Sequence, residues 1–473
     1  MSIIIPANSA VSGGFDVANS CMFNRADSAN MTRSASGSSA TKSTFSFWVK
    51  RTLISAGGDF TQIIHNFYSA GTTYNKLYFD GNDQIIMKQQ VSGSTQIQIM
   101  PSMKFRDASA WYHIVYIVDP TESTEANRVK VYVNGTQITS FGTSTYPAED
   151  AAVRVEYNQF IGREYSGDTK FFNGYLAEFV FLDGVAASIG DLGEFDEDSG
   201  IWKPIDVSGL TFGSRGFYLD FEDSSALGND AVGSNNFTVN NIAATDQGTD
   251  TCTNNFATLN ILAPPSSGLD IRQGNTLVFN DDDNNAWQTI PATMVITPTG
   301  KFYWEIFCSG VWGTSACEAH GITDLDTTLQ TLTGQASANA TTFAWQNNAS
   351  FRSNGGTVGS TTWAVTYATN DILMFALDNA NGALYAGKNG TWLNSGNPES
   401  GSSKTGALAV TVGLNYAPHS EVKYGSDNPF YNFGSPYYAI SSGNADGDGI
   451  GNFEYAVPSG YFALCTKNLA EYG

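Results

Sequence analysis

The sequence lacks long apolar runs. No segment of its 473 residues approaches the roughly 20 consecutive apolar residues that cross a bilayer, so we expect no membrane insertion. The opening stretch MSIIIPANSAVSGG has no basic region and only a short apolar run, unlike a secretory signal peptide. Both absences argue against a membrane-spanning or conventionally exported protein.

Cysteine is also scarce. Five residues, scattered along the chain, are too few for a disulfide-stapled fold. Cys308 and Cys317 flank the stretch SGVWGTSA, and a hairpin could bring them together. We expect free and mostly buried thiols, with a Cys308–Cys317 disulfide as the alternative. No second cysteine pair supports a cysteine-based metal site.

Basic residues are outnumbered. The chain has 45 acidic and 23 basic residues, which gives a net charge of −22. Such a field repels phosphate backbones, so nucleic acid is not an expected partner. The simplest role of this charge is to keep the surface soluble, although it could also attract divalent cations.

Charged residues of both signs make up only 14% of the chain. Ser, Thr, Asn and Gly take the polar positions instead, and these residues suit turns because they bond to turn backbone. No long segment shows a sustained period of 3.6 residues. The sequence therefore predicts an all-β fold, and its length favours two β-sandwich domains.

Period-two alternation marks the strands of the first half. STFSFWVKR (Ser43–Arg51) predicts a half-buried strand, and WYHIVYIVD (Trp111–Asp119) is apolar enough for a strand buried on both faces. RVKVYVNGTQI (Arg128–Ile138) contains Asn134-Gly135, the preferred type I′ hairpin turn. FNGYLAEFVFLDGV (Phe172–Val185) repeats the alternation along its whole length.

The second half continues the pattern. GKFYWEIF (Gly300–Phe307) alternates, and DILMFALDNANGALYAGKNGTWL (Asp371–Leu393) reads as strands separated by turns at Asn381-Gly382 and Asn389-Gly390. ALAVTVGLNY (Ala407–Tyr416) predicts another buried strand. This spacing of strands and turns suits a second sandwich.

The predicted organisation has four parts. Residues 1–14 form an extended N-terminal arm, and residues 15–223 form the first sandwich. Residues 224–265, rich in Asn, Asp, Thr and Gly and ending in two prolines, form a connector that is partly ordered against one or both domains. Residues 266–473 form the second sandwich with a C-terminal extension.

These stretches resemble two known families. STFSFWVKR, WYHIVYIVD, VYVNGTQI and FNGYLAEFVFLDG, in that order, are similar to the laminin-G-like (concanavalin-A-like) jelly roll over most of residues 12–222. GKFYWEI, Gly321-Ile322 and DILMFALDNANGALYAGKNGTWLNSGNP resemble the SPRY sandwich over roughly residues 270–435. The resemblance implies binding of glycans or proteins rather than catalysis, although a fold does not by itself define a function.

Two more stretches, GFYLDFEDSSALGND (Gly216–Asp230) and GYFALCTKNL (Gly460–Leu469), resemble segments of predicted phage structural proteins. A phage virion protein assembles in the host cytoplasm and leaves by lysis. That route would explain a surface-protein composition without an export signal. We therefore expect the chain on a virion surface.

Catalysis has few candidates. Glu194, Asp196 and Asp198 in GEFDEDSG have the alternate spacing with which jelly-roll glycan hydrolases place carboxylates on one strand. The stretch is bounded by glycines, however, and is more typical of an exposed acidic loop. The four histidines are spread out, and His113 falls in a buried strand. No nucleophile elbow, HExxH or phosphate loop occurs, so we expect no enzyme activity.

One stretch begins like a calcium loop. NADGDGIGNFE places Asn444, Asp446 and Asp448 at alternate positions, as oxygen ligands of calcium require. Glu454 comes one place too early to close such a loop, so a turn-rich loop without a cation is the alternative. We expect no required cofactor and leave room for a structural Ca²⁺ ion.

Ligand contacts are predicted at one end of the second sandwich. SPRY domains usually recognise partners with loops there, and Trp312, Trp345, Phe351, Arg352 and Trp363 fall in or beside such loops. Aromatic faces stack on sugars and anchor protein interfaces. Burial of the tryptophans in the sandwich core is the alternative.

The predicted function is non-enzymatic recognition of a host-surface glycan or protein by a phage tail fibre or similar appendage. A capsid decoration or structural tail protein, which stabilises the particle by binding neighbouring subunits, is the alternative. A glycan depolymerase is a weak third. The expected partners are other virion proteins and the host-surface ligand, in a homo-oligomer.

Overall fold

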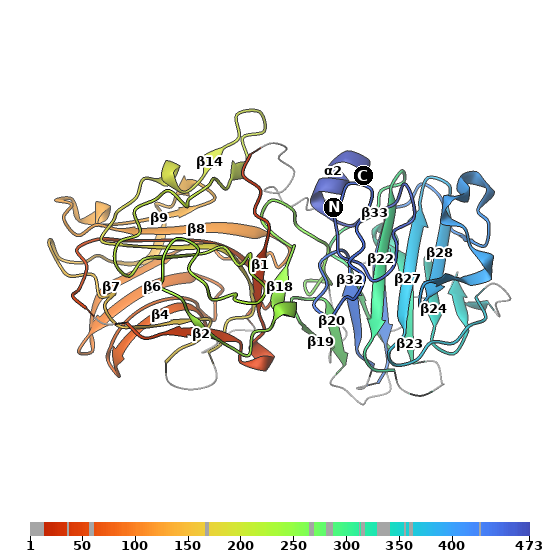
Figure 1. Cartoon of the computed structure of the whole chain (residues 1–473), viewed down its shortest axis with the longest axis horizontal. Helices are drawn as coiled ribbons and strands as arrows, with labels where there is room; N and C mark the ends of the chain where they lie inside the picture. Colours follow the sequence, from red (N-terminus) through yellow and green to blue (C-terminus); the bar gives the residue numbers. More distant parts are fainter. Residues whose placement is uncertain are drawn as a thin grey trace. The chain divides into compact units, whose positions relative to one another are not determined.

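The computed structural model describes residues 14–35, 37–55, 61–165, 170–263, 269–280, 287–311, 313, 317–328, 341–353, 356–358, 363–424 and 427–473. Within these residues the chain divides after Thr253 into a first unit and a second unit. Each unit is a β-sandwich of two largely antiparallel sheets (Figure 1). The predicted all-β fold of two tandem sandwiches is confirmed. The predicted N-terminal arm lies outside the described residues, apart from Gly14.

The first unit contains two eight-stranded sheets, sheet A and sheet B. Sheet A has the order β10 (Thr136–Gln137), β9 (Val129–Val133), β8 (Trp111–Val118), β3 (Ser43–Arg51), β13 (Gly174–Asp183), β1 (Ser20–Phe23) and β18 (Gln247–Gly248), with β16 (Phe217–Leu219) also paired to β13. Sheet B has the order β11 (Phe141–Thr145), β7 (Ser94–Pro101), β6 (Ile85–Val91), β5 (Thr73–Phe79), β4 (Gln62–Ala70), β12 (Asn158–Ile161), β2 (Asn30–Arg33) and β17 (Thr238–Asn240). A separate hairpin joins β14 (Glu194–Phe195) to β15 (Trp202–Lys203).

Alternating apolar residues fill the space between sheets A and B, as the period-two pattern predicts. Phe45, Phe47 and Val49 of β3 face this core together with Phe67 and Phe79 from sheet B. The predicted hairpin turn after β9 is confirmed, because Asn134 and Gly135 both have positive φ angles.

Strand β13 departs from uniform alternation. Its register with β3 shifts between Ala177 and Val180, and Glu178 has a φ of 47°. This bulge moves the apolar face by one residue, so that Leu176 and Phe179 both face the core. Glu178 consequently lies on the outer face of sheet A, where its carboxylate accepts a hydrogen bond of 2.5 Å from the Tyr218 hydroxyl.

Residues 184–253 pass over the outer face of sheet A and also contribute β16, β17 and β18 to the two sheets. Val115, Ile117 and Val180 pack there against Leu192 and Val207 from this covering segment. The cover buries polar groups that would otherwise meet water. We call residues 184–253 the covering segment.

The predicted connector is ordered against both units, because residues 224–253 pack on the first unit and Ala257 and Leu259 lie in the core of the second unit. Strand β17 pairs with β2 and β18 pairs with β1, so residues 224–253 extend both sheets of the first unit. Leu227 and Phe237 of this stretch lie in the core between the sheets. These strands are short and polar, so the sequence shows no alternating pattern from which their pairing could be predicted.

The second unit contains sheet C and sheet D. Sheet C has the order β19 (Leu269–Arg272), β20 (Leu277–Asn280), β32 (Pro429–Asn432), β22 (Lys301–Cys308), β27 (Ile372–Asp378), β28 (Ala383–Lys388) and β29 (Thr391–Trp392), with β30 (Leu408–Ala409) paired to β28 and β33 (Phe462–Ala463) paired in parallel to β22. Sheet D has the order β21 (Gln288–Pro291), β31 (Tyr416–Val422), β23 (Glu318–Asp324), β24 (Thr342–Gln346), β25 (Phe351–Ser353) and β26 (Gly356–Val358).

Two short α-helices, α1 (Leu325–Thr328) and α2 (Thr466–Tyr472), accompany the sheets. None of the helices among the described residues is long and apolar enough to cross a membrane. The prediction of one buried strand over Ala407–Tyr416 is wrong, because only Leu408–Ala409 and the first residue of β31, Tyr416, pair there and Val412 is 56% exposed.

A buried ion pair fastens the covering segment to sheet A. Lys50 Nζ lies 2.7 Å from Asp250 Oδ2, and both side chains are almost inaccessible to solvent. Trp111 Nε1 donates to the other oxygen of Asp250 at 3.0 Å. Removing one partner of such a pair leaves an uncompensated buried charge.

We predict that Asp250→Asn destabilises the first unit by about 3–5 kcal/mol, because the Lys50 ammonium loses its counter-charge inside the protein. Chemical denaturation would measure this change. Asp220→Asn, at a partly exposed carboxylate in the same segment, is the matched control, and we expect a change below about 0.5 kcal/mol. Equal effects of the two substitutions would contradict the assignment of the Lys50–Asp250 pair.

Candidate functional site

The outer face of sheet B presents a group of aromatic side chains. The alternation in TYNKLYF sends Leu77 and Phe79 of β5 into the core, and Tyr74, Lys76 and Tyr78 to the other side. These three outward residues are only partly buried, unlike the outer face of sheet A. The sequence thus builds a face that combines rings with a basic group.

Tyr165 and Tyr68 form the centre of this face. Their rings stack with centroids 3.8 Å apart and planes 15° apart. Phe160 of β12 packs edge-on against Tyr165 at 5.4 Å. Tyr165 remains 44% exposed, so part of its ring is available to a ligand. We call Tyr68, Tyr74, Tyr78, Phe160 and Tyr165 the tyrosine face.

Charged groups hold the tyrosine face together. Lys76 Nζ lies 4.7 Å and 5.0 Å from the ring centroids of Tyr74 and Tyr78. The same ammonium lies 3.0 Å from Glu164, and Lys170 lies 2.6 Å from the other oxygen of that carboxylate. Although burial acts to raise the pKa of Glu164, the two lysines hold it below its usual value. The rings are therefore positioned before any ligand arrives.

A groove of about 500 Å³ lies next to these rings. It is lined by Thr32, Arg33, Ser34, Asn158, Phe160, Asn236 and Thr238. Phe160 belongs both to the groove and to the tyrosine face. Amide, hydroxyl and guanidinium groups beside an aromatic wall provide the mixture of stacking and hydrogen bonding that polar ligands require.

One unsatisfied group lies on the same outer face. Asn66 of β4 stands in register with Phe160 on one side and Lys76 on the other. Its side chain is buried, and Oδ1 has no hydrogen-bond partner among the described residues. A buried polar atom without a partner is costly, so it favours a ligand or water that donates to it.

The ligand contacts predicted in the second sandwich lie in its core. Trp345, Phe351 and Trp363 are at most 2% exposed and pack against one another in the apolar interior. They cannot stack on a surface ligand, so this prediction is wrong for the three aromatic residues. Arg352, between them on β25, is half-buried with no hydrogen-bond partner for Nε among the described residues. Trp312 lies outside the described residues.

The predicted calcium loop uses its oxygens internally. Asp446 Oδ1 accepts hydrogen bonds from the backbone of Asp448 and Ile450, and Oδ2 accepts from Ala463 N and Asn468 Nδ2. The Asn444 amide donates to the carbonyl of Glu454 at 2.9 Å. Asp446 therefore organises a turn-rich loop, and a cation would have to displace four donors. This arrangement contradicts Asn444, Asp446 and Asp448 as a cation site.

The carboxylates considered for catalysis close a hairpin. Glu194 lies on β14, and Lys203 of β15 lies 3.3 Å from both Glu194 and Asp196. Asp196 also accepts hydrogen bonds from the backbone N–H and the hydroxyl of Ser199, which lower its pKa to about 2. A permanently ionised carboxylate in a turn lacks the raised pKa of a glycosidic general acid.

A serine–histidine pair does occur, but its proton is on the wrong nitrogen. Ser46 Oγ lies 2.8 Å from His113 Nε2, and Trp202 Nε1 donates to His113 Nδ1 at 2.8 Å. Because indole can only donate, Nδ1 is the acceptor and Nε2 carries the hydrogen. The imidazole therefore donates to Ser46 and cannot take its proton, and the pair is also buried beneath the covering segment.

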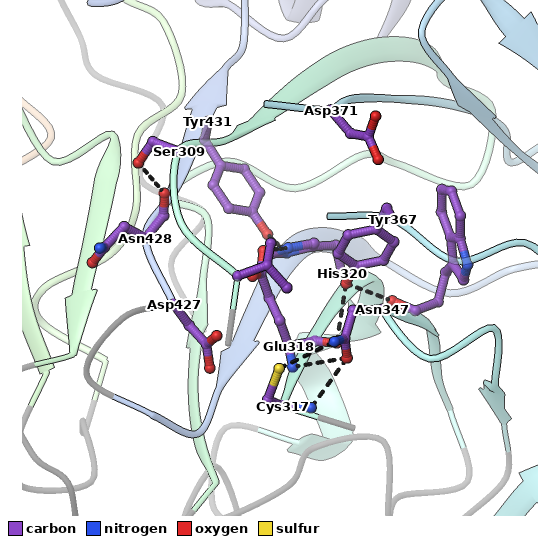
Figure 2. Close-up of polar contacts among 12 residues, drawn as sticks. Ser309, Cys317, Glu318, His320, Asn347, Tyr367, Asp371, Asp427, Asn428 and Tyr431 are labelled. Carbon is purple, nitrogen blue, oxygen red and sulfur yellow. Dashed lines mark hydrogen bonds and ion pairs between the residues drawn. The ribbon is translucent and has the colours of Figure 1, made fainter. Parts of the chain in front are cut away.

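A second polar cluster lies inside the second unit (Figure 2). His320 of β23 contacts the Tyr431 hydroxyl through Nδ1 at 2.9 Å and Glu318 through Nε2. Burial lowers the pKa of His320 to about 3 and raises the pKa of Glu318 well above its usual value. Cys308, Glu318 and His320 each place a donor atom within 4.8 Å of the other two. Cys308 and Cys317 are both buried and form no disulfide, as predicted.

Comparison with known proteins gives a family likeness for the first unit. Residues 24–187 match the model of the concanavalin A-like lectin/glucanases superfamily. This match supports the predicted jelly-roll fold of the first unit. No curated protein matches the chain.

Solved structures give more distant likenesses. The SPRY domain of human HERC1 is 9% identical, covers 37% of this chain and 96% of its own length, and has a TM-score of 0.29. A putative carbohydrate binding protein from Bacteroides ovatus is 15% identical, with coverage of 48% and 60% and a TM-score of 0.34. A SAP-like pentraxin from Limulus polyphemus is 13% identical, with coverage of 37% and 81% and a TM-score of 0.27. Such low TM-scores say nothing about function.

The pKa of Glu178 gives a test of the cover over sheet A. Burial raises this pKa to about 8, from 4.5 for a free side chain, although the Tyr218 hydroxyl opposes the shift. The folded protein therefore keeps a proton that the unfolded chain loses above pH 4.5. The contribution of Glu178 to the free energy of unfolding is therefore fully present below pH 4.5 and is lost as the pH rises towards 8.

We predict that Glu178→Gln, which cannot ionise, gains stability relative to the wild type as the pH rises from 5 to 8. Thermal unfolding at several pH values would measure the difference in melting temperature between the variant and the wild type. The test is how this difference changes with pH, not its value at any one pH. Glu222→Gln, at an exposed carboxylate nearby, serves as the control and should show no such slope. A constant difference between Glu178→Gln and wild type across this range would show that Glu178 is ionised and solvated.

Proposed function

We propose that this chain is a non-enzymatic glycan-recognition protein of a bacteriophage particle surface, and that the first unit binds the glycan through the tyrosine face and the adjoining groove. The observation that carries this proposal is the partly exposed Tyr165 ring, stacked on Tyr68 at the edge of a groove lined by amides and hydroxyls. Sugars present apolar ring faces and a rim of hydroxyls, and both need a partner in a binding site.

The arrangement of the first unit supports this choice of face. The covering segment occupies the outer face of sheet A, whereas aromatic rings on sheet B remain accessible. The match of residues 24–187 to a superfamily named for lectins and glucanases agrees with a sugar ligand. The closed Asp196 turn and the donor form of His113 favour binding over hydrolysis.

The location on a tail fibre or similar appendage rests on the sequence. The low charge content and the two phage-like segments support a virion protein assembled in the host cytoplasm. A capsid decoration or structural tail role uses the same fold to bind neighbouring subunits. The test below separates these roles.

We predict that Tyr165→Ala lowers the affinity of the purified protein for its host-cell glycan about tenfold or more, because it removes the exposed half of the stacked pair. Binding would be measured on a glycan array and on host cells. Phe195→Ala is the matched control, since Phe195 is 51% exposed on the β14–β15 hairpin away from the tyrosine face. We expect this control to bind like the wild type.

Three results would contradict the proposal. Equal binding by both variants would exclude the tyrosine face. Absence of glycan binding, together with tight binding to virions that lack this protein, would establish the decoration or structural role. Release of new reducing ends from the bound glycan would establish a depolymerase.

A further inference from the structure

The Glu318–His320 contact brings two electron-pair donors face to face. The Tyr431 hydroxyl donates its only proton to the carbonyl oxygen of His419 at 2.7 Å. It must therefore accept a hydrogen bond from His320, so Nδ1 carries the hydrogen of the imidazole and Nε2 carries a lone pair. This lone pair points at a carboxyl oxygen of Glu318. Either the hydrogen of a protonated Glu318 carboxyl group or a metal ion bound by both groups satisfies this lone pair.

Two further donor atoms at this place are unused. Glu318 Oε2 is buried and has no hydrogen-bond partner among the described residues. The Cys308 thiol is also fully buried, and no hydrogen bond to the described part of the chain engages it. The sulfur, a carboxylate oxygen and an imidazole nitrogen lie within 4.8 Å of one another. Small side-chain shifts bring donors at this spacing to the bond lengths of zinc, roughly 2.0–2.3 Å.

We propose that Cys308, Glu318 and His320 bind a divalent transition-metal ion, for which zinc is the best fit, and that this ion fastens sheet C to sheet D inside the second unit. Cys308 belongs to β22 of sheet C, whereas Glu318 and His320 belong to β23 of sheet D. Thiolate, imidazole and carboxylate are the ligands that zinc takes in proteins.

The charges and the outer contacts suit such an ion. Binding releases the thiol proton of Cys308 and the carboxyl proton of Glu318, so two negative ligands neutralise the doubly charged ion in the core. The hydrogen bond from His320 Nδ1 to Tyr431 then orients the ligating ring, as the outer partner of a metal-bound histidine usually does.

The neighbouring strand provides a natural control. His419 and Glu421 of β31 repeat the same residue types two positions apart, and His419 Nε2 lies 3.1 Å from Glu421 Oε1. In the part of the chain that the structure describes, only the Cys308–Glu318–His320 group brings three potential ligand atoms together. His419→Gln should therefore leave metal binding intact, whereas His320→Gln should abolish it.

The experiment begins with the wild-type full chain. After dialysis against metal-free buffer, mass spectrometry of the elements should find about one first-row transition metal per chain. The protein is then unfolded with a chelator and refolded with or without zinc chloride. We expect the metal-free protein to melt several degrees lower, and zinc to restore the original melting temperature.

Variants locate the ion. Cys308→Ser and His320→Gln should lose the metal, and the controls Cys465→Ser and His419→Gln should keep it, since Cys465 is a buried thiol outside the cluster. If a variant fails to fold, the wild-type measurements still decide. Wild-type protein without stoichiometric metal, which refolds with an unchanged melting temperature in chelator, would show that a proton bridges Glu318 and His320 and would overturn the proposal.

Discussion

The cover over the outer face of sheet A is the constraint on which the first unit depends. Both faces of this sheet are buried, one by sheet B and one by residues 184–253. Every polar side chain under the cover must then find a partner inside the protein. Lys50 forms an ion pair with Asp250, and Glu178 accepts a hydrogen bond from Tyr218. His113 forms hydrogen bonds with Ser46 and Trp202. These groups resemble catalytic ones, but they form their hydrogen bonds and ion pair with one another beneath the covering segment.

The same constraint makes the two faces of the sandwich differ in the exposure of their aromatic rings. Aromatic residues on sheet A serve the core or its cover, whereas Tyr165 on the sheet B side keeps an exposed ring. Its stacking on Tyr68 and the contact with Phe160 fix the ring without burying it. A preformed aromatic surface loses little conformational entropy when a ligand binds, which is an advantage in weak and multivalent recognition.

The strands could be predicted from the sequence because their side chains alternate between environments. Strand β3 begins and ends where STFSFWVKR predicts, although it is buried on both faces rather than half-buried, and Asn134-Gly135 forms the expected turn. The bulge at Glu178 could not be predicted from the sequence. The amino-acid pattern of β13 continues to alternate through the bulge, but the side chains after the bulge point to the opposite face of the sheet. The short strands β17 and β18 owe their pairing to distant partners, so residues 224–253 resembled a connector.

The candidate site was harder to predict for a similar reason. The outward row of Tyr74, Lys76 and Tyr78 is visible in TYNKLYF, but Tyr68, Phe160 and Tyr165 meet only through the pairing of β4 with β12. Conversely, Trp345 and Trp363 resembled ligand contacts because an isolated tryptophan carries no sign of its burial. Amide and carboxylate spacing alone suggested a calcium loop at Asp446, where four N–H groups take up the oxygens.

Hydrogen–deuterium exchange with and without a glycan that the protein binds would test the central claim most directly. The account predicts that the glycan slows exchange in β2, β12 and β17 and in the segment that carries Tyr165, while exchange in the second unit is unchanged. Protection confined to the second unit, or to the β14–β15 hairpin, would contradict the assignment of glycan recognition to the outer face of sheet B.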